Sequence, residues 1–240
     1  MPYYIYGRNT CIERIKKGED IKKVYLQTNL KDPKILDLVK DLDYENVDKS
    51  KLDKLVNNTH HQGIVCEIKT FETVSLEEVV KIADSKEYPL IVILDSIEDP
   101  HNIGAIMRTC DALDINSIIV PKHNSAPLTS TVAKVSTGAI EYVKVAEVSN
   151  LTNTINKLKD LGYWVVGAEA SGTIDYRKVD YKTKIALVVG SEGKGISRLV
   201  LKQCDYVVSI PMLGHVNSLN VSNATAVLLY GIHSVRYPAK

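Results

Sequence analysis

Apolar runs alternate regularly with helical patterns from Tyr88 to the C-terminus. Six such runs predict strands: Leu90–Leu94, Ser117–Val120, Tyr142–Val145, Tyr163–Ala168, Ile185–Val189 and Tyr206–Ile210. Because nearly every position in these runs is apolar, we expect strands that are buried on both faces, as in a parallel sheet. Alternation with helices predicts a doubly wound α/β domain, with functional loops beyond the carboxyl ends of the strands.

The first seventy residues predict a second, smaller α/β domain. Strand signals lie in "YYIY", "IKKVYLQ", "YENV" and "GIVCEIK", with helical stretches at Thr10–Lys17, Pro33–Asp41 and Lys49–Asn57. Asp32 is the expected cap before Pro33. Residues 71–87 contain one helix, with capping-box spacing between Ser75 and Glu78, and we interpret them as a linker. The expected domains are therefore 1–70 and 88–240, and we expect the second to fold without the first.

Composition narrows the class of protein without naming its function. A chain of 240 residues with 45% hydrophobic residues can bury two cores of unequal size. No apolar run approaches the ~20 residues that span a bilayer, so we expect no membrane segment. The four cysteines are far apart in the sequence, which favours buried thiols in a reducing cytoplasm over a disulfide framework or a zinc site. The net charge of +1 does not by itself suggest nucleic acid.

The first loop that can carry chemistry is "LDSIEDPHNIGAIMRTCDAL", where a strand gives way to a helix. Asn102 can cap the helix or orient a neighbouring group, and Gly104 permits close approach of the backbone. Arg108 provides a forked donor suited to phosphate. A purely structural interpretation stays open here, with Asn102 as cap, Gly104 for packing and Arg108 paired with Asp111.

The second loop, "VVGSEGKGIS", has three glycines directly after an apolar strand. Its spacing fits neither GxxxxGK[ST] nor GxGxxG. Glu192 in the middle of the loop argues against bound phosphate and favours a ligand that is positively charged or rich in hydroxyl groups. A flexible turn is the structural alternative.

The third loop, "SIPMLGHVNSLNVSNATAVLLY", crowds amides and hydroxyls at one helix start. These are Asn217, Ser218, Asn220 and Ser222. Since one cap is enough for a helix, the surplus favours a function.

Together, in order and spacing, these loops resemble the three signature motifs of the SpoU/TrmH family of RNA ribose 2′-O-methyltransferases, in the SPOUT superfamily. The resemblance runs to the C-terminal end. "YGRNTCIERI" and "HHQGIVCEI" are similar to the small αβα RNA-binding domain attached to many members. The subgroup resembles the RlmB type, which methylates a guanosine of 23S ribosomal RNA.

The resemblance implies an α/β fold with a deep trefoil knot, a homodimer, and S-adenosylmethionine bound by the knot loops. Matching motifs assign cofactor contacts to Gly190, Ile210 and Leu219, with Gly193 giving close approach. In this sequence the glycine cluster follows the fifth predicted strand. Rossmann-type methyltransferases carry their glycine-rich loop after the first strand, so the position favours the knotted class. The implied partners are RNA and a second copy of the chain, and the chemistry needs no metal.

The same resemblance assigns the catalytic roles. Arg108 matches the arginine proposed as base or activator of the ribose hydroxyl. Because the guanidinium pKa exceeds ~12, stabilising the alkoxide and holding phosphate is an equally physical role. Asn102 would orient Arg108 or RNA, Glu192 would anchor Arg108 or substrate hydroxyls, and Ser218 with Asn220 would complete the pocket. His215 and His101 are alternative bases that we disfavour.

Two rival functions stay open from the sequence. One is a transfer-RNA ribose methyltransferase of the same family, and the other is a non-catalytic RNA-binding protein that kept a knotted dimer. The N-terminal domain favours ribosomal RNA. Its cations predict a surface that binds RNA phosphates in a salt-dependent way, formed by Arg8, Arg14, Lys16, Lys17, Lys22 and Lys23.

Overall fold

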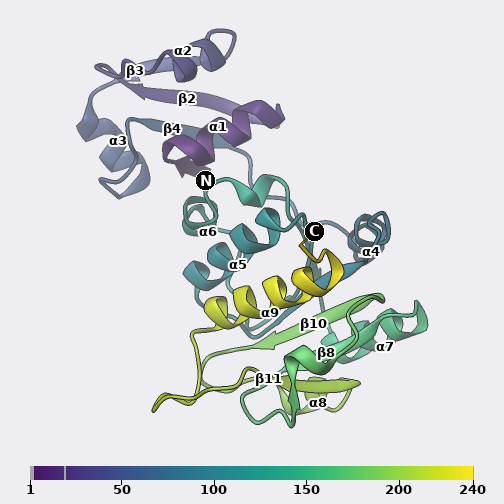
Figure 1. Ribbon diagram of the computed structural model, residues 1–240. Coiled ribbons are helices and arrows are strands. Elements are labelled where there is room, and N and C mark those ends of the chain that lie inside the picture. The colour runs from purple at the N-terminus through teal and green to yellow at the C-terminus, as the bar shows by residue number, and fades with distance from the viewer. Residues whose placement is uncertain (1–2, 19, 240) are drawn as a thin grey trace. The chain divides into compact units, whose positions relative to one another are not determined.

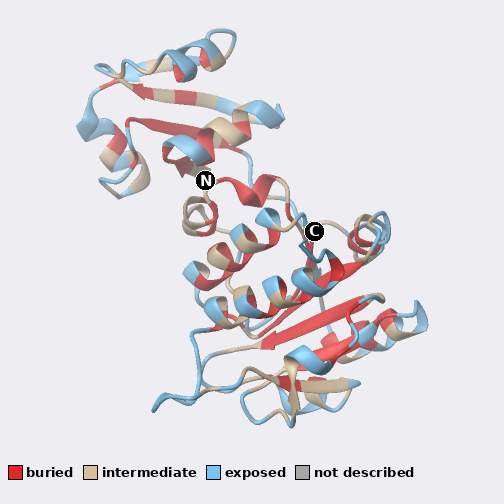
Figure 2. Cartoon of the chain, viewed as in Figure 1, coloured by how far each residue is buried: buried red, intermediate tan, exposed pale blue. Residues whose placement is uncertain are grey.

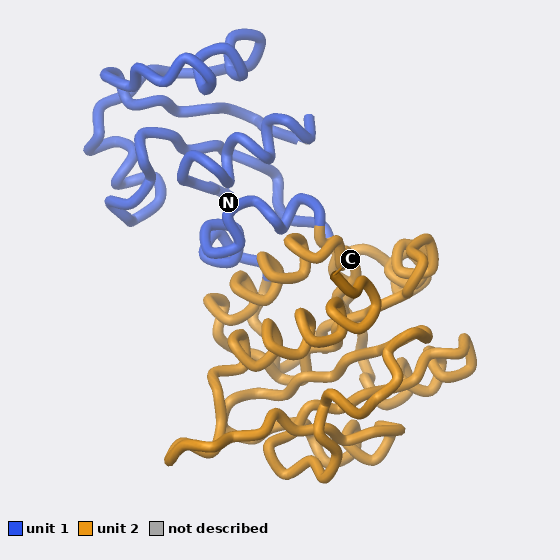
Figure 3. The backbone as a smooth tube through the Cα atoms, in the orientation of Figure 1, with its two compact units in different colours: residues 1–72, 128–142 blue, residues 73–127, 143–240 orange. Residues whose placement is uncertain are grey.

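A computed structural model describes residues 3–18 and 20–239 and divides the chain into two compact units. Unit 1 comprises residues 1–72 together with 128–142, and unit 2 comprises residues 73–127 and 143–240 (Figure 3). The chain therefore passes from unit 1 into unit 2, returns to unit 1 for residues 128–142, and then completes unit 2.

Unit 1 has a four-stranded sheet, in the order β1-β4-β2-β3 over the described residues. Its elements are β1 (Tyr3–Tyr6), α1 (Arg8–Lys17), β2 (Ile21–Gln27), α2 (Pro33–Val39), β3 (Tyr44–Val47), α3 (Lys49–Val56), β4 (Ile64–Ile68), α6 (Ser130–Val135) and the 3₁₀ turn η1 (Ala139–Glu141). The predicted strands are confirmed to within a residue. Asp32 caps α2 as predicted, since its carboxylate accepts from the amides of Lys34 and Ile35.

Unit 2 has a seven-stranded sheet over the described residues, in the order β7-β6-β5-β10-β8-β11-β9, and all its strand pairs are parallel. Its strands are β5 (Leu90–Asp95), β6 (Ser117–Pro121), β7 (Lys144–Val148), β8 (Trp164–Ala168), β9 (Ile174–Asp175), β10 (Ile185–Gly190) and β11 (Tyr206–Ser209). Its helices are α4 (Leu76–Asp84), α5 (Pro100–Ala112), α7 (Leu151–Asp160), α8 (Arg198–Leu201), α9 (Val221–Arg236) and the 3₁₀ turn η2 (Tyr176–Lys178).

Helices cover both faces of this sheet, as a sheet of apolar strands requires. Figure 1 shows α5 and α9 side by side on one face, with α7 and α8 on the other. Every residue of β5 is buried, and the central strands form the red interior of Figure 2. The predicted mostly parallel α/β domain is confirmed.

The predicted strands differ from the observed ones at two places. The run expected at Tyr142–Val145 starts later, at Lys144, because Tyr142 belongs to the segment that packs in unit 1. The two-residue strand β9 was not predicted, since Ile174 and Asp175 are too few to show a pattern.

Buried thiols were expected at all four cysteines, but Cys204 is partly exposed.

The helix of the expected linker packs into unit 2. Ser75 caps α4 by accepting from the Glu78 amide, as its spacing predicts. Val79, Val80 and Ala83 are buried in the same core cluster as residues of β5 and β10. The helix therefore contributes to the core of unit 2, and the three-way division of the chain stays a prediction.

Residues 128–142 pack against the N-terminal residues through buried polar contacts. The Thr10 hydroxyl donates to the carbonyl of Ala133 at 3.1 Å, and the Tyr142 hydroxyl donates to Glu13 at 2.6 Å. Arg14 and Glu141 form an ion pair of 3.0 Å whose side chains are 5% and 1% exposed. A chain that starts at Tyr88 would keep this segment but lose the residues that it packs against.

We predict that Arg14→Met destabilises unit 1 by about 3–5 kcal/mol, because Glu141 is left as a buried charge without that ion partner. Replacing both residues with apolar side chains should recover part of the loss. Chemical denaturation followed by circular dichroism measures it.

The matched control is Lys16→Met, which removes an exposed ion pair with Glu13 on the same helix. An exposed pair contributes roughly 0–1 kcal/mol, so the control should unfold nearly like the parent. Equal effects of the two substitutions would contradict the structural role of the buried pair.

Candidate functional site

Three loops meet where the central strands of unit 2 end. In the parallel pairing of β10 with β5, Gly190 lies beside Asp95, so the loops after both strands leave the same edge of the sheet. β11 ends at Ser209, and the segment 210–220 follows it. The three sequence motifs thus converge at the carboxyl edge, as the doubly wound topology predicts.

A cavity of about 470 Å³ opens at this edge, and we call it the glycine-loop cavity. The four residues predicted to contact the cofactor, Gly190, Gly193, Ile210 and Leu219, all line it. Ser218 lines it as well. Apolar and polar side chains both line the wall, which suits a ligand with both a flat apolar part and charged groups.

The glycine loop folds back on itself. The amide of Ser191 donates to the Gly195 carbonyl, and the Gly195 amide donates to the Ser191 carbonyl, at 3.1 and 2.8 Å. A Cβ at Gly190 would overlap the backbone of Gly195 and Ile196. A side chain at Gly190 would therefore collide with the loop itself, so the turn requires this glycine. A Cβ at Gly193 meets nothing within 4 Å, which leaves that position open.

Two carboxylates that sequence reasoning missed hold the far end of the glycine loop. Asp95, at the end of β5, accepts from the Ser197 amide at 2.7 Å. Glu169, just after β8, accepts from the Ile196 amide at 2.9 Å and lines the cavity. The sequence did contain a signal for these two carboxylates, because an acidic residue lies at the carboxyl end of each of the two strands that flank β10.

Asn102, Glu192 and Asn220 form a hydrogen-bonded network that joins the three motifs. The Asn102 amide donates to a Glu192 carboxylate oxygen at 3.1 Å, and the Asn220 amide donates to the Asn102 carbonyl oxygen at 3.0 Å. Asn220 also donates to the same Glu192 oxygen. Asp99 caps α5, so Asn102 is not the cap and its side chain is available for this network.

Asn220 has a second role at the start of α9. Its side-chain oxygen accepts from the amides of Ser222 and Asn223, at 2.9 and 3.4 Å, and from the Ser222 hydroxyl at 2.6 Å. One residue therefore caps the helix and holds Glu192. The surplus of polar residues noted in the sequence is accounted for by this double role and by Asn217 and Ser218 in the cavity wall.

The structure does not bring Arg108 to the network within one chain. Arg108 lies six positions beyond Asn102 on α5, which corresponds to a rotation of about 240° and a rise of about 9 Å. Arg108 is exposed and makes no hydrogen bond or ion pair with any residue that the structure describes, Asp111 included. His215 is also exposed and lies outside the glycine-loop cavity, and His101 contacts Asp99.

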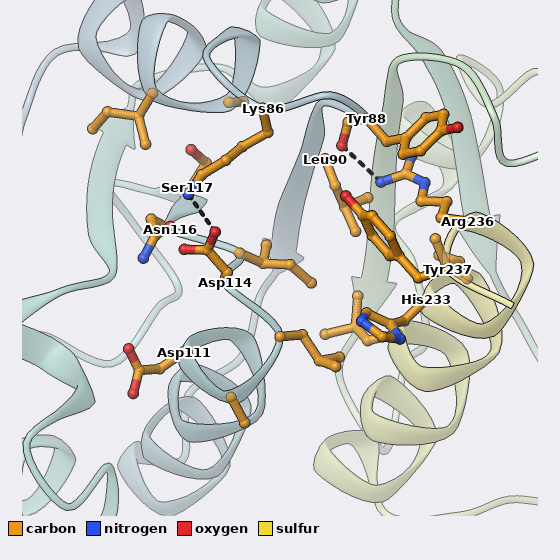
Figure 4. Close-up of a pocket in the computed structure, with 17 residues that line it drawn as sticks. Lys86, Tyr88, Leu90, Asp111, Asp114, Asn116, Ser117, His233, Arg236 and Tyr237 are labelled. Carbon is orange, nitrogen blue, oxygen red and sulfur yellow. Dashed lines mark hydrogen bonds and ion pairs between the residues drawn. The ribbon is translucent and has the colours of Figure 1, made fainter. Parts of the chain in front are cut away.

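A separate cavity of about 340 Å³ lies at the opposite edge of the sheet, where β5 and β6 begin (Figure 4). Here Arg236 donates to the backbone carbonyls of Tyr181, Tyr88 and Thr183 at 2.8–3.0 Å. Burial lowers the pKa of its guanidinium to about 10, because desolvation disfavours the charged form. This arrangement fastens the end of α9 to the sheet, so we assign the cavity a structural role.

Within residues 3–18 and 20–239, no helix combines the length and apolar character needed to cross a membrane. In the same residues, no group of three or more His, Cys, Asp or Glu side chains is placed to hold a metal ion.

Comparison with known proteins agrees with this architecture. Residues 89–230 match the SpoU rRNA Methylase family, and residues 4–74 match the family described as RNA 2′-O ribose methyltransferase substrate binding. A Staphylococcus haemolyticus protein assigned to the TrmH family of tRNA/rRNA methyltransferases is 44% identical over 97% of this chain and 96% of its own length. The Bacillus subtilis relative YacO, with the same assignment, is 42% identical over 98% and 96%.

Among solved structures, the SpoU methyltransferase AviRb from Streptomyces viridochromogenes, crystallised with the cofactor AdoMet, is similar in fold. It has a TM-score of 0.84 at 22% identity and covers 100% of this chain and 92% of its own. The fold and the site thus define an RNA methyltransferase. The chain belongs to the SpoU/TrmH family, whose methyl donor is S-adenosylmethionine.

The glycine-loop cavity fits this cofactor. Its volume of about 470 Å³ lies within the roughly 300–1,000 Å³ typical of ligand pockets. Leu219 and Ile210 offer apolar contact for a flat ring, and the open side of Gly193 lets the ligand approach the backbone. The carboxylates of Glu169 and Glu192 complement a positively charged sulfonium.

We predict that Leu219→Ala lowers the affinity for S-adenosylmethionine roughly tenfold, or about 1.4 kcal/mol, through lost apolar contact. Leu219 is 37% exposed, so folding should change little. Isothermal titration calorimetry measures the affinity. Leu213→Ala is the control, because Leu213 is in the same loop but is 100% exposed and outside the cavity wall. Equal affinities of the two variants would place the cofactor elsewhere.

Proposed function

We propose that this protein transfers a methyl group from S-adenosylmethionine to the ribose 2′-hydroxyl of a guanosine in 23S ribosomal RNA, in the cytoplasm and as a homodimer. The observation that carries the proposal is the Asn102–Glu192–Asn220 network, in which Glu192 lines the glycine-loop cavity. The deep trefoil knot belongs to the same proposal. The four free cysteines support a reducing compartment.

The chemistry requires alignment and control of one proton. When bound, S-adenosylmethionine supplies an electrophilic methyl group, and the protein must hold the ribose hydroxyl in line with it. Glu192 is fixed by two amides, so its carboxylate is oriented before substrate arrives. In this proposal Glu192 anchors substrate hydroxyls, while Ser218 and Asn220 complete the wall around the reacting group.

Arg108 would serve the site of the second protomer. Its exposed side chain lacks any described partner, and it lies far around α5 from Asn102 of its own chain. In a symmetric dimer a residue excluded from its own site can complete the partner's. There its guanidinium would stabilise the developing alkoxide and bind the neighbouring phosphate, both of which need a permanent forked donor.

The surface for such a dimer is formed by two neighbouring helices. α5 and α9 pack side by side on one face of the sheet (Figure 1). Their outer faces carry Arg108 on α5, and Val227 and Tyr230 on α9 at 36% and 54% exposure. Apolar side chains exposed beside one another are typical of an interface core, with the arginine suited to its edge.

We predict that Arg108→Ala removes nearly all methyl transfer but leaves the affinity for S-adenosylmethionine within a few-fold. Arg108→Lys should also fail, since an ammonium cannot copy the fork. Single-turnover assays with saturating ribosomal RNA measure the transfer, and calorimetry measures the affinity.

Complementation separates action within one chain from action across the dimer. Arg108→Ala and Glu192→Ala chains, coexpressed with different tags, should each be inactive alone. Random pairing leaves about one quarter of the sites intact if Arg108 serves the partner, so that fraction of activity should return. No recovery in isolated mixed dimers would show that Arg108 acts in its own chain.

Unit 1 offers a surface for the RNA backbone. A cavity of about 580 Å³, which we call the basic cavity, is lined by Arg8, Lys31 and Lys49 and by no carboxylate among the described residues. The amino-terminal ends of α1 and α3 begin at two of these cations, and helix amino termini favour anions. The buried ring of His61 accepts from the Gly63 amide and contacts Asp53, which fixes the adjoining turn.

The basic cavity differs from the RNA-binding surface expected from the sequence. Arg14 is buried against Glu141, and Lys16 and Lys23 are paired with Glu13 and Glu45. Of the six cations named in the sequence, only Arg8 is among the residues that line the basic cavity, and its guanidinium also pairs with Asp32 at 3.2 Å. Folding brings Lys31 and Lys49 to it from later in the chain.

We predict that the double variant Lys31→Gln/Lys49→Gln weakens binding of deproteinised ribosomal RNA roughly tenfold and flattens its salt dependence, because two phosphate contacts are lost. Filter binding over a range of salt concentrations measures both quantities. The control is Lys22→Gln/Lys54→Gln, which removes two exposed cations of unit 1 outside the cavity. An unchanged salt dependence of RNA binding in Lys31→Gln/Lys49→Gln would exclude the basic cavity as the RNA-binding surface.

Mapping 2′-O-methyl sites in RNA from cells with and without the protein tests the proposal as a whole. Loss of one guanosine mark in 23S RNA is the expected result, and loss of a transfer-RNA mark would favour the alternative ribose methyltransferase. Unchanged marks together with undetectable binding of S-adenosylmethionine would favour the non-catalytic binding protein.

A further inference from the structure

A third cavity in unit 2 shares a wall with the glycine-loop cavity. It measures about 370 Å³, and we call it the Glu98 cavity. The shared wall is formed by residues 191–194 and Val221. Glu192 lines both cavities, and its partner Asn102 lines the Glu98 cavity, so the hydrogen-bonded network lies at the boundary between the two spaces.

The outer walls of this cavity are loops held in a fixed conformation. The Ser96 hydroxyl donates to Asp95 at 3.0 Å, and the Ala126 amide donates to the Ile97 carbonyl at 3.0 Å, which ties the loop after β5 to the loop after β6. Ser96 and Asn124 both have positive φ, 62° and 60°. Such backbone conformations persist only where the surroundings enforce them.

Three polar side chains that line the Glu98 cavity take no part in the hydrogen bonds and ion pairs of the described residues. Glu98, Asn124 and Lys194 line it and are exposed. None of the three forms a hydrogen bond or ion pair with a residue in the described ranges. The other acids of the cavity are engaged, since Asp99 caps α5 and Glu192 holds the network. A carboxylate, an amide and an ammonium are thus left available to a ligand.

The chemistry of the boundary limits what this ligand can be. A nucleotide whose ribose lies at the network, facing the glycine-loop cavity, can place its base across the shared wall, in the Glu98 cavity. Bases splayed out of single-stranded RNA are read by hydrogen bonds to their Watson–Crick edges. A carboxylate only accepts, and guanine alone presents two neighbouring donors on that edge, N1–H and the N2 amine.

We infer that the Glu98 cavity receives the base of the target nucleotide, and that Glu98 selects guanine by accepting hydrogen bonds from N1–H and the N2 amine. Lys194 binds the adjoining phosphate, and Asn124 contacts the remaining base edge. This inference rests on the proposed ribose methylation, because it takes the network as the place of the ribose. It adds a residue that determines specificity and does not touch the transferred methyl group.

The experiment compares Glu98→Gln with the parent and with Glu147→Gln, which alters an exposed carboxylate of β7 outside the three cavities of unit 2. The substrate is deproteinised ribosomal RNA from cells lacking the protein, and the methylated nucleosides are identified by mass spectrometry. The parent and Glu147→Gln should produce 2′-O-methylguanosine. Glu98→Gln should lower kcat/KM at least tenfold while the affinity for S-adenosylmethionine stays unchanged.

A second measurement tests for the contact itself. In an RNA fragment spanning the mapped site, inosine replaces the target guanosine and removes only the N2 amine. The parent should lose activity on inosine, whereas Glu98→Gln should lose much less, because its contact is already impaired.

The outcomes separate the inference from the function on which it rests. Equal kcat/KM of Glu98→Gln and Glu147→Gln overturns the inference alone. Methylation of another nucleoside by the parent overturns the inference together with the guanosine assignment, and leaves ribose methyl transfer standing. If the parent transfers no methyl group to RNA, the proposed function fails and the inference fails with it.

Discussion

The parallel pairing of β10 with β5 and β8 is the constraint on which the site depends. It places the glycine loop between two neighbouring strand ends, where Asp95 and Glu169 accept from its amides. The loop is therefore held from both sides before any ligand arrives. Glu192, at its tip, meets Asn102 and Asn220, which lie 90 and 28 positions away in the sequence. Preorganisation of this kind lets a carboxylate act without reorganising during the reaction.

Much of the fold could be predicted from the sequence because the apolar runs are long and buried on both faces. The strands at Leu90 and Ile185 and the caps at Asp32 and Ser75 follow from local chemistry alone. The late start of β7 could not be predicted, since Tyr142 is apolar enough to extend the run but packs against Glu13. That contact depends on a partner 129 positions away.

The candidate site, like the fold, could be predicted only in part. The motifs brought together Asn102, Glu192 and Asn220, because each belongs to the loop or helix start that follows a strand and the topology gathers these segments at one edge. The separation of Arg108 from them depends on its rotation around α5, which motif spacing does not express. Gly190 shows another limit: a glycine required by its own turn and a glycine required by a ligand look the same in a sequence.

The segment 128–142 has a consequence for synthesis of the chain. A polypeptide leaves the ribosome from its N-terminus, and a domain that is continuous in sequence can fold as soon as it emerges. Unit 1 is not continuous, because Arg14 finds Glu141 only after 127 further positions have been made. Until then, the apolar residues of the first 72 positions lack part of their cover. Unit 1 is therefore the first to emerge but can finish folding only after residue 142 has been made. At that point most strands of the unit 2 sheet have still to be synthesised.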